Sequence, residues 1–467
     1  MNNSHMYDLD AAGAIDYPET ENYSYDKWHC TPGLTDASEY KSVRFQMLQE
    51  NLLLHWKYAY LEVQGRLVQK ANGAHYASGA NIAPIFNAIP HLFANAKFTI
   101  GTRCVENINH VGHVSSLMQY VLLPRSLSKE GGIQFMWVVD TDPTATNANK
   151  GWEARRKYVI ETPESKGKFK FRMPLNMIFG ICDNFIALRG YPVDIELIRG
   201  PDYPALYRAD GTGEGKFAFT SMALNIPVIT PSNAVNLKIL QGIQYPKPYN
   251  FSFRCRNGLM AVVPKELSTY QLTITNDSFA ERPQMIFVGF QTTKVKDQKF
   301  NYASYTHQDL ETMVIRMNNC QIRSKPITAQ FKENDNGFWF EQMLHLRANY
   351  LQFSGIYTEN SFLNPDLFRS LYTVFCFDVS KQHDLVSSRT VSCELHATFR
   401  TDIQDDTHIY VAWYFDRTLE LFTNGQAINI KSHTGSAHLL TDPRTEHGSK
   451  NYGNYSNRKR LRPTDPV

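Results

Sequence analysis

The stretch HIYVAWYF, residues His408–Phe415, alternates its side chains with a period of two. Ile409, Val411, Trp413 and Phe415 point to one side, and their neighbours point to the other. A strand covered on one face only must alternate in this way, whereas a strand buried in a parallel sheet is apolar throughout. The same alternation recurs over most of the 467 residues and predicts antiparallel sheets that pack face to face.

Length and composition set limits on the class of protein. A chain of 467 residues is too long for one ordinary core and predicts two domains, or two fused copies of one. The formal net charge of +3 gives no global field that would recruit nucleic acid or an anionic membrane. The charge is uneven, because the first 26 residues are acidic and the last ten are basic.

The cysteines favour a reducing compartment. There are seven, an odd number, and no two of them form a CxxC pair, which excludes the usual zinc-ribbon and redox motifs. Cys376 and Cys393 lie inside apolar strand patterns, where a thiol acts as a small hydrophobic side chain.

Secretion and membrane insertion are not expected. The chain opens polar and acidic, unlike a signal peptide. No apolar run approaches the roughly 18 residues that span a bilayer. We therefore interpret the glycosylation sequon at Asn250–Ser252 as a coincidence.

The first half of the chain is predicted to start with an extended arm, residues 1–40, because this stretch is polar and has no clear periodicity. Residues 41–235 then form a first jelly roll. Its strands are expected at 58–69, 133–139, 168–173 and 193–198, and helices are expected over 82–89 and 114–122. Pro124 should end the second helix.

The second half begins after a proline cluster at 226–248, since proline cannot donate to a sheet ladder. Residues 245–425 form the second jelly roll, with a hairpin turn at Asn318 and a loop-rich region at 326–366. Residues 426–467 form a flexible basic tail. The strands of the second half are expected at 249–255, 270–275, 285–290, 312–317, 374–377, 391–399 and 408–415.

The fold class is therefore mainly β: two tandem eight-stranded antiparallel jelly rolls with a few short helices in the connections.

Several segments occur in an order and spacing that is typical of one known family. In the first half they are IAPIFN (82–87), HLF (91–93), AKFTI (96–100), HV (113–114), QYVL (119–122), MW (136–137) and DTD (140–142). In the second half they are KFNY (299–302), SKP (324–326), FCFDVS (375–380) and the strand ending in FD (415–416). Over about residues 50–420 the chain resembles the double jelly-roll major capsid proteins of Polinton-like and adintovirus-like DNA viruses, distant relatives of adenovirus hexon. The acidic arm, the basic tail and the missing proline in KFNY depart from the family pattern.

The resemblance implies a structural protein without enzymatic activity, cofactor or metal. Such a protein forms a homotrimer whose six jelly rolls make a pseudo-hexagonal capsomer in an icosahedral shell. It would contact neighbouring capsomers, penton and minor capsid proteins in the virion. It would be made in the host cytosol, with assembly in the host nucleus left open. The stretches 140–156, 200–216 and 326–366 are candidates for outward towers and trimer clasps.

The other motifs that could carry chemistry favour a structural role. Gly211–Lys216 resembles a phosphate loop, but Asp210 stands at the first glycine position and Phe217 replaces the hydroxyl residue. His110 and His113 have a spacing that could share a metal, but no third ligand is near in sequence. We also expect no catalytic role for Asp194 with Glu196, or for His29 with Cys30.

The basic run near the C-terminus carries three hypotheses that the sequence leaves open. Arg458, Lys459, Arg460 and Arg462 could form a nuclear localisation signal, an inward arm that contacts the phosphates of packaged DNA, or a solvated terminus.

The alternative function for the whole chain is that of a carbohydrate-binding or carbohydrate-active β-sandwich protein. Such a protein would show a cleft lined by exposed aromatic side chains and carboxylates.

Overall fold

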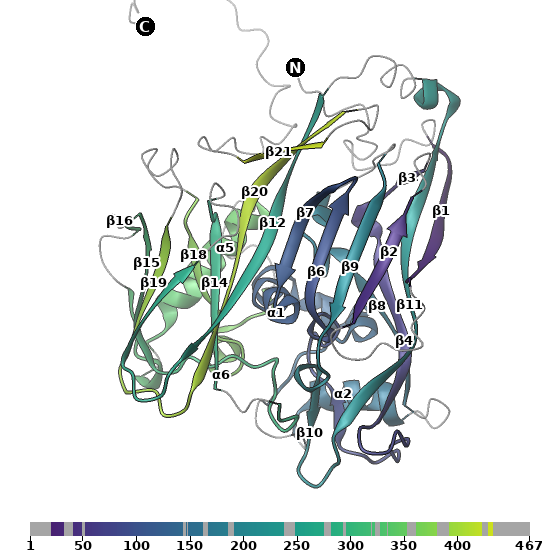
Figure 1. Cartoon of the computed structure of the whole chain (residues 1–467). Coiled ribbons are helices and arrows are strands. Elements are labelled where there is room, and N and C mark those ends of the chain that lie inside the picture. Colours follow the sequence, from purple (N-terminus) through teal and green to yellow (C-terminus); the bar gives the residue numbers. More distant parts are fainter. Residues whose placement is uncertain are drawn as a thin grey trace, which may run out of the picture.

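The computed structural model shows two halves that stand side by side, with α1 between them (Figure 1). It describes residues 20–31, 41–48, 52–142, 146, 148–161, 167–184, 191–237, 248–274, 282–292, 296–318, 320–322, 327–333, 335–352, 361–380, 392–422 and 428–432.

The first half consists of two packed sheets and a short ribbon. One sheet has the strand order β1-β11-β4-β8, with β3 also paired to β11, and the other has the order β2-β9-β6-β7. Strands β10 and β5 form the ribbon. The strands are β1 (Thr20–His29), β2 (Ser42–Met47), β3 (Leu53–Leu54), β4 (Tyr60–Gln69), β5 (Ile82–Pro84), β6 (Phe93–Ile100), β7 (Arg103–Asn109), β8 (Lys168–Pro174), β9 (Val193–Arg199), β10 (Leu206–Arg208) and β11 (Gly215–Pro231).

The second half also consists of two sheets. One has the order β12-β20-β14-β18 with β21 paired to β20, and the other has the order β13-β19-β15-β16 with β17 paired to β15. The strands are β12 (Pro248–Val263), β13 (Thr269–Ile274), β14 (Met285–Thr292), β15 (Leu310–Met317), β16 (Cys320–Gln321), β17 (Ile327–Thr328), β18 (Phe375–Asp378), β19 (Cys393–Phe399), β20 (Thr407–Phe422) and β21 (Ile428–Ser432).

The two halves repeat one topology. When the main-path strands of each half are numbered in chain order, the two sheets read 1-8-3-6 and 2-7-4-5 in both halves. All the paired strands in these sheets are antiparallel. This order, in which the first strand lies beside the last and the second beside the seventh, is that of a jelly roll. The predicted mainly β fold with antiparallel sheets is therefore confirmed.

Short helices fill the connections, as predicted. The α-helices are α1 (Val111–Leu122), α2 (Lys150–Arg156), α3 (Ile181–Asn184), α5 (Gly337–Leu351) and α6 (Pro365–Ser370). The 3-10 turns are η3 (Trp56–Tyr58), η4 (Pro90–Leu92), η5 (Arg125–Ser128), η6 (Gly132–Phe135), η8 (Leu175–Met177), η9 (Tyr203–Ala205) and η10 (Phe331–Glu333), and η7 (Lys157–Glu161) is a π-helix.

Strand β20 contains the stretch that predicted the fold, but it is buried on both faces. Val411 and Trp413 are 1% exposed, while Tyr410 and Tyr414 on the opposite face are 5% and 4% exposed. The second face is covered by helices, because His113 of α1 stacks on Tyr410 and Tyr350 of α5 packs edge-on against Tyr414. The tyrosines preserve an alternating pattern although they lie inside the protein.

Helix α1 joins the two halves into one core. All of its residues except His113 are buried, as expected for a helix that is packed on every side. A Cβ at Gly258 of β12 would lie 2.2 Å from Cγ2 of Val114, and one at Gly289 of β14 would lie 2.6 Å from Cδ2 of Leu117. Both glycines therefore allow the helix to approach the second jelly roll closely.

Three predicted elements in the interior of the chain are wrong. Residues 82–89 form the strand β5 and a turn instead of a helix, and residues 133–139 start with the 3-10 turn η6 instead of a strand. The region 326–366, expected to be loop-rich, contains the helix α5. Trp339 and Met343 of this helix are fully buried, so it belongs to the core and is not an outward tower.

The two ends of the chain also contribute strands. Strand β1, within the expected arm 1–40, pairs with β11 along its length. Strand β21, within the expected tail 426–467, pairs with β20. Strand β1 is a polar edge strand, and such strands lack the apolar alternation used for the prediction.

Candidate functional site

The junction between the two jelly rolls is centred on a buried carboxylate, that of Glu106 on β7. Its Oε1 accepts hydrogen bonds from the backbone amides of Gly180 (3.0 Å) and Arg256 (2.8 Å), and its Oε2 accepts one from Ile181 (3.1 Å). Glu106 is 0% exposed. Burial raises the pKa of Glu106 to about 7, although the neighbouring Arg256 and the three amides favour the charged form.

Arg256 reaches from β12 into the first half. Its guanidinium donates to the carbonyls of Asn176 (2.6 Å) and Ile178 (3.2 Å) and pairs with the carboxylate of Asp183 at 2.8 Å. Arg417 on β20 also donates to the carbonyl of Val105. Donors of the second jelly roll thus bind acceptors of the first. We call Glu106, Asp183 and Arg256 the junction charge cluster.

Close backbone contact accompanies this cluster. A Cβ at Gly180 would lie 1.8 Å from the carbonyl oxygen of Arg254 on β12. No side chain fits there, so glycine is required for the segment before α3 to lie against β12. The hydrogen bonds of Glu106 depend on that approach.

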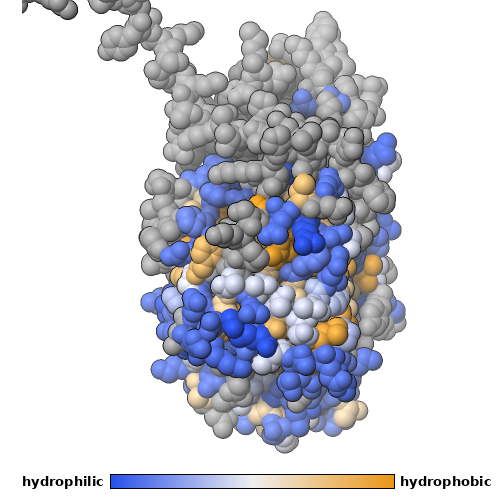
Figure 2. Space-filling view, turned by 90° about the vertical axis from the view of Figure 1, so that its left-hand side faces the viewer, coloured by the Kyte–Doolittle hydropathy of each residue, from blue (hydrophilic) through white to orange (hydrophobic). Residues whose placement is uncertain are grey.

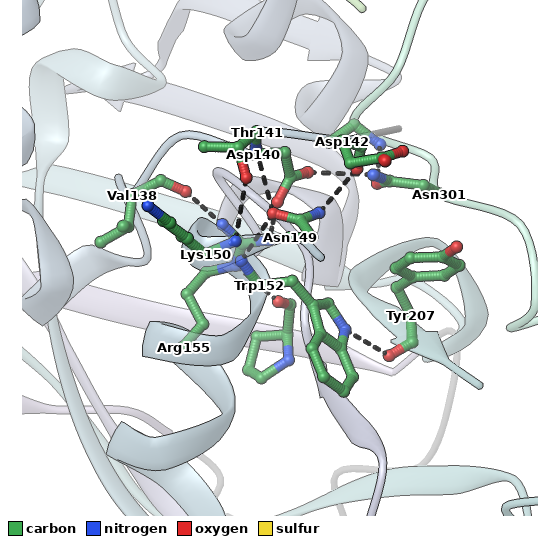
Figure 3. Close-up of polar contacts among 12 residues, drawn as sticks. Val138, Asp140, Thr141, Asp142, Asn149, Lys150, Trp152, Arg155, Tyr207 and Asn301 are labelled. Atoms are coloured by element: carbon green, nitrogen blue, oxygen red, sulfur yellow. Dashed lines mark hydrogen bonds and ion pairs between the residues drawn. The ribbon is translucent and has the colours of Figure 1, made fainter. Parts of the chain in front are cut away.

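A second buried ion pair lies near the lower end of the molecule in Figure 1 and is shown in Figure 3. Arg155 of α2 pairs with Asp140 at 2.5 Å, and both side chains are 0% exposed. Arg155 also donates to the carbonyl of Pro84 (2.8 Å), and Asn301 of the second half donates to the other oxygen of Asp140 (2.9 Å). Part of the predicted tower at 140–156 is therefore a buried contact between the halves.

The outer face of the sheet β1-β11-β4-β8 is aromatic and cationic. Tyr25 and Tyr58 are 52% and 47% exposed, and Tyr25 lies 5.9 Å from Tyr60 between ring centroids. Tyr23 lies 6.2 Å from Tyr25. Tyr58 belongs to the turn η3, and its ring lies 4.6 Å from that of His55, which is 6.1 Å from the ring of Tyr23. We call Tyr23, Tyr25, Tyr58 and Tyr60 the tyrosine face.

Beside the tyrosine face, cations surround one carboxylate. Glu62 binds Lys27 (2.7 Å), Lys170 (3.2 Å) and Arg172 (3.4 Å). Its desolvation favours the neutral form, but hydrogen bonds from Lys27, Gln64 and Lys170 prevail and lower its pKa to about 2. The cations outnumber this carboxylate, so the patch is positively charged.

The outer face of the second jelly roll differs. Figure 2 shows this side of the molecule as mainly hydrophilic, with hydrophobic residues in small groups. On the sheet β13-β19-β15-β16, Glu394 accepts from Gln271 (3.3 Å) and lies 3.3 Å from His396. These groups are typical of a solvated sheet face.

His110 and His113, whose spacing could share a metal but for which we expect a structural role, make structural contacts. His110 is the N-cap of α1 with a φ of 51°. The Nδ1 of His113 lies 2.9 Å from the hydroxyl of Tyr305, and its ring stacks on Tyr410 at 3.6 Å. Within the described ranges there is no group of three or more His, Cys, Asp or Glu that could hold a metal ion.

The remaining sequence motifs also have structural contacts. Gly211 lies in an exposed turn and Gly215 begins β11, so Gly211–Lys216 does not open a helix. Asp194 pairs with Arg44 at 2.6 Å, and Glu196 accepts from Ser42 at 2.6 Å.

All seven cysteines are free. Arg458, Lys459, Arg460 and Arg462 lie outside the described residues. Across the part of the chain that the structure describes, no helix has both the length and the apolar composition needed to cross a membrane.

Sequence reasoning did not find Glu106, Arg256 or the tyrosine face. Glu106 stands in the polar pattern RCVENIN, where nothing distinguishes it from a solvated glutamate. The signal for the tyrosine face was present, because tyrosines alternate with polar residues at 23 and 25 within the expected arm.

Comparison with known proteins agrees with this architecture. The double jelly roll-like domain family matches residues 85–419, which is more than half of the chain. The chain therefore belongs to the double jelly roll-like domain family.

Solved structures extend the similarity over nearly the whole chain. A protein of the Sputnik virophage structure is similar with a TM-score of 0.56 and 10% identity, covering 92% of each chain. The mavirus major capsid protein gives 0.54 and 10% identity, covering 88% of this chain and 91% of its own. The Faustovirus major capsid protein gives 0.53 and 9% identity, covering 85% and 90%. At these identities the similarity concerns the fold. No curated protein matches the sequence.

Proposed function

We propose that this chain is a major capsid protein, a non-enzymatic subunit of an icosahedral virus shell. The observation that carries the proposal is the duplicated jelly roll, held as one body by α1 and the junction charge cluster. Two proteins of the same fold, from mavirus and Faustovirus, are major capsid proteins by name and match over 85% or more of both chains. A rigid pair of jelly rolls is a suitable building block, because three copies supply six similar lobes.

The capsomer in this proposal is a homotrimer in which the tyrosine face contacts a neighbouring subunit. Tyrosine and arginine are enriched at the centres of protein interfaces, and large exposed aromatic groups on a monomer mark contact surfaces. The tyrosine face combines both, since Arg172 lies over the ring of Tyr60 at 5.9 Å. On the outer face of the sheet β13-β19-β15-β16, the described positions Gln271, Thr273, Glu394 and His396 carry polar side chains in place of tyrosines.

The oligomeric state tests the proposal directly. Three chains of 53.6 kDa give a mass of about 161 kDa, which light scattering after size-exclusion chromatography separates from a monomer. Negative-stain electron microscopy of the same fraction should show six-lobed particles. A chain that stays monomeric at high concentration and forms no such particles would contradict the capsid role.

The variant Tyr25→Ser/Tyr58→Ser tests the contact surface separately. We expect it to fold and to elute as a monomer, because both rings are exposed and their loss does not open the core. The control Gln271→Ser/Thr273→Ser, on the polar face of the second jelly roll, should remain trimeric. If the tyrosine variant also remains trimeric, the contact lies elsewhere although the trimer itself stands.

The same proposal extends to the partners of the trimer. We propose that neighbouring capsomers, penton and minor capsid proteins surround it in the virion, and that assembly follows synthesis in the host cytosol.

We also propose a role for the basic tail. Its residues Arg458, Lys459, Arg460 and Arg462 contact the phosphates of packaged DNA. A synthetic peptide of residues 450–467 should then bind duplex DNA with an affinity that falls steeply with salt. If the peptide does not bind DNA but a reporter fused to the tail enters the nucleus, the localisation signal is favoured instead.

The tyrosine face also keeps the carbohydrate-binding alternative open to test. Exposed aromatic rings on a sheet can stack on sugars. However, the carboxylate beside them, Glu62, is only 3% exposed and is held by Lys27, Lys170 and Arg172. A glycan array with the monomeric tyrosine variant as control separates the two functions.

A further inference from the structure

A cavity of about 400 Å³ lies at the junction between the jelly rolls, and no step of the proposed function uses it. Both halves line it. The lining includes His91, His110 and His113 from the first half, and Met260, His408 and Tyr410 from the second. A volume of this size is in the range of cavities that hold small organic ligands.

The lining has an unusual chemical composition. Among the described residues that line the cavity there are four histidines but no aspartate, glutamate, lysine or arginine, and most of the others are aromatic or apolar. A cationic ligand would therefore find no counter-ion, whereas the imidazoles can donate hydrogen bonds or take up a proton. An apolar ligand body would find Phe93, Met260 and Phe300.

The four histidines divide into an inner and an outer pair. His91 and His113 are engaged inside, where Nε2 of His91 lies 3.0 Å from the hydroxyl of Ser116 and Nδ1 of His113 lies 2.9 Å from that of Tyr305. His110 and His408 are half-buried, as is His113. His110 and His408 both lie edge-on to Tyr410, at 6.4 and 5.9 Å between ring centroids. These two rings therefore both lie beside Tyr410 in the cavity wall.

The outer pair is poised to take up a proton when an anion arrives. Burial lowers the pKa of His110, and His408 lowers it further because two cationic rings would repel. Burial also lowers the pKa of His408, with Asp406 acting in the opposite direction. The other titratable groups on the wall are His91, His113 and the tyrosines Tyr203, Tyr302 and Tyr410, and none of them supplies an anion near neutral pH.

We propose that this cavity binds a small organic acid, with its apolar body inside and its carboxylate at the outer histidine pair, His110 and His408. Binding places one proton from solvent on the outer pair, so that an imidazolium faces the carboxylate. The bound acid bridges the two jelly rolls, since His110 belongs to the first and His408 to the second. It stabilises their junction by mass action.

Isothermal titration calorimetry of the full chain with 2-naphthoate tests this site, and 2-naphthylmethanol is the neutral probe of matched shape. Uptake of one proton makes binding about tenfold tighter for each unit of decreasing pH while the free histidines are neutral. We therefore expect 2-naphthoate to bind about tenfold more tightly at pH 6.5 than at pH 7.5. Repeating the titration in buffers of different ionisation enthalpy should give an uptake near one proton.

Two sets of variants assign the site. His110→Asn preserves the helix cap and the positive φ, since asparagine tolerates both. Together with His408→Asn it should abolish the pH dependence and weaken 2-naphthoate at least tenfold. Ala94→Phe should fill the cavity and block both probes. The control His345→Asn removes an exposed histidine of α5 and should leave binding unchanged.

Each outcome decides the matter. Binding of 2-naphthoate with proton uptake that depends on His110 and His408 supports the proposal. No heat with either probe at either pH overturns it, and so does equal, pH-independent binding of both probes, which would make the cavity a neutral apolar site. Binding that survives Ala94→Phe places the acid elsewhere on the protein and also overturns the proposal. The trimer mass is an independent measurement, so failure of this site leaves the capsid role untouched.

Discussion

The junction between the two jelly rolls is built in two different ways along one strand. At Arg256 on β12 the halves are joined by the junction charge cluster, in which charged groups and backbone amides are hydrogen-bonded at 2.6 to 3.2 Å. Four residues further along, at Met260, the same strand lines the cavity that contains His91, His110, His113 and His408, which we call the histidine cavity. Four residues of strand span about 13 Å, so the two regions are close neighbours.

The junction charge cluster fixes the arrangement of the two jelly rolls, whereas the histidine cavity can adjust to pH or to a ligand. Buried charges with specific partners are costly to disturb, because removing one partner leaves the other uncompensated. Neutral imidazoles around a cavity can change protonation or accept a ligand at a lower cost. We therefore expect mutations in the charge cluster to act on folding, and changes at the histidine cavity to act on pH dependence and binding.

The strongest test removes Arg256 from the charge cluster. Arg256→Met should destabilise the protein by about 3–5 kcal/mol, because Asp183 and the buried Glu106 lose their cationic neighbour. Urea denaturation followed by tryptophan fluorescence gives the free energy of unfolding. Lys157→Met, at an exposed pair on the surface, is the control and should give no measurable change. A loss no larger than that of the control would mean that the cluster does not hold the halves together.

The next test concerns the close packing of α1 across the junction. Gly258→Ala places a methyl group 2.2 Å from Cγ2 of Val114 and should cost about 1–3 kcal/mol through overpacking. Gly79→Ala is the matched control, because no atom lies within 4 Å of its added Cβ. Thermal unfolding of the two variants compares them directly. Equal melting temperatures would show that α1 can shift without cost.

Much of the fold could be predicted from local patterns. Strands with one apolar face, such as β8 and β9, were found within one or two residues of their bounds because their alternation is uninterrupted. The turn at Asn318 also follows the prediction, since its φ is 49° and Met317 pairs with Cys320. The errors lie where tertiary contacts override the pattern. The apolar residues from Ile82 to Ile89 have helical spacing but are all buried, so spacing did not determine their conformation.

The junction could not be predicted in the same way. Glu106 and Arg256 are 150 residues apart in sequence, and nothing in the strand pattern marks either as buried. The spacing of His110 and His113 is visible in the sequence, but His408, which forms the outer pair with His110, comes from the other half. Long-range pairing of this kind requires the three-dimensional arrangement.

A decrease in pH should change the contributions of the two regions to stability in opposite directions. It should weaken the contribution of the buried histidines and strengthen that of Glu106. Burial lowers the pKa of His91 to about 3 and that of His113 well below its usual value, so the unfolded chain takes up protons below pH 6.5 while these rings stay neutral. Their contribution to stability is complete above pH 6.5 and is lost as pH falls, by about 2 kcal/mol for His91 at pH 5. Glu106, with its pKa raised to about 7, contributes most below pH 4.5 and loses this contribution as pH rises through 7.

Single variants separate the two contributions. His91→Leu should flatten the loss of stability between pH 6.5 and 5, and Ser116 keeps Asn87 as a hydrogen-bond partner at 3.1 Å. Glu106→Gln should instead steepen that loss, because the opposing carboxyl no longer titrates. Urea denaturation at several pH values measures both. Identical pH profiles in the wild type and the two variants would show that neither region titrates as the structure indicates.

The smallest expected effect lies far from the junction, at the edge strand β1. Lys27→Met removes one of three cations around Glu62, and Lys27 itself is 37% exposed, so the loss should stay below about 1 kcal/mol. The effect should be local, because among the described strands of its sheet β1 pairs with β11 alone and can open without disturbing α1. Hydrogen exchange should therefore speed up at the amides of β1 and not at those of β12. If exchange accelerated in both strands equally, the edge and the junction would belong to one cooperative unit, and the contrast between a fixed junction and an independently opening edge would not hold.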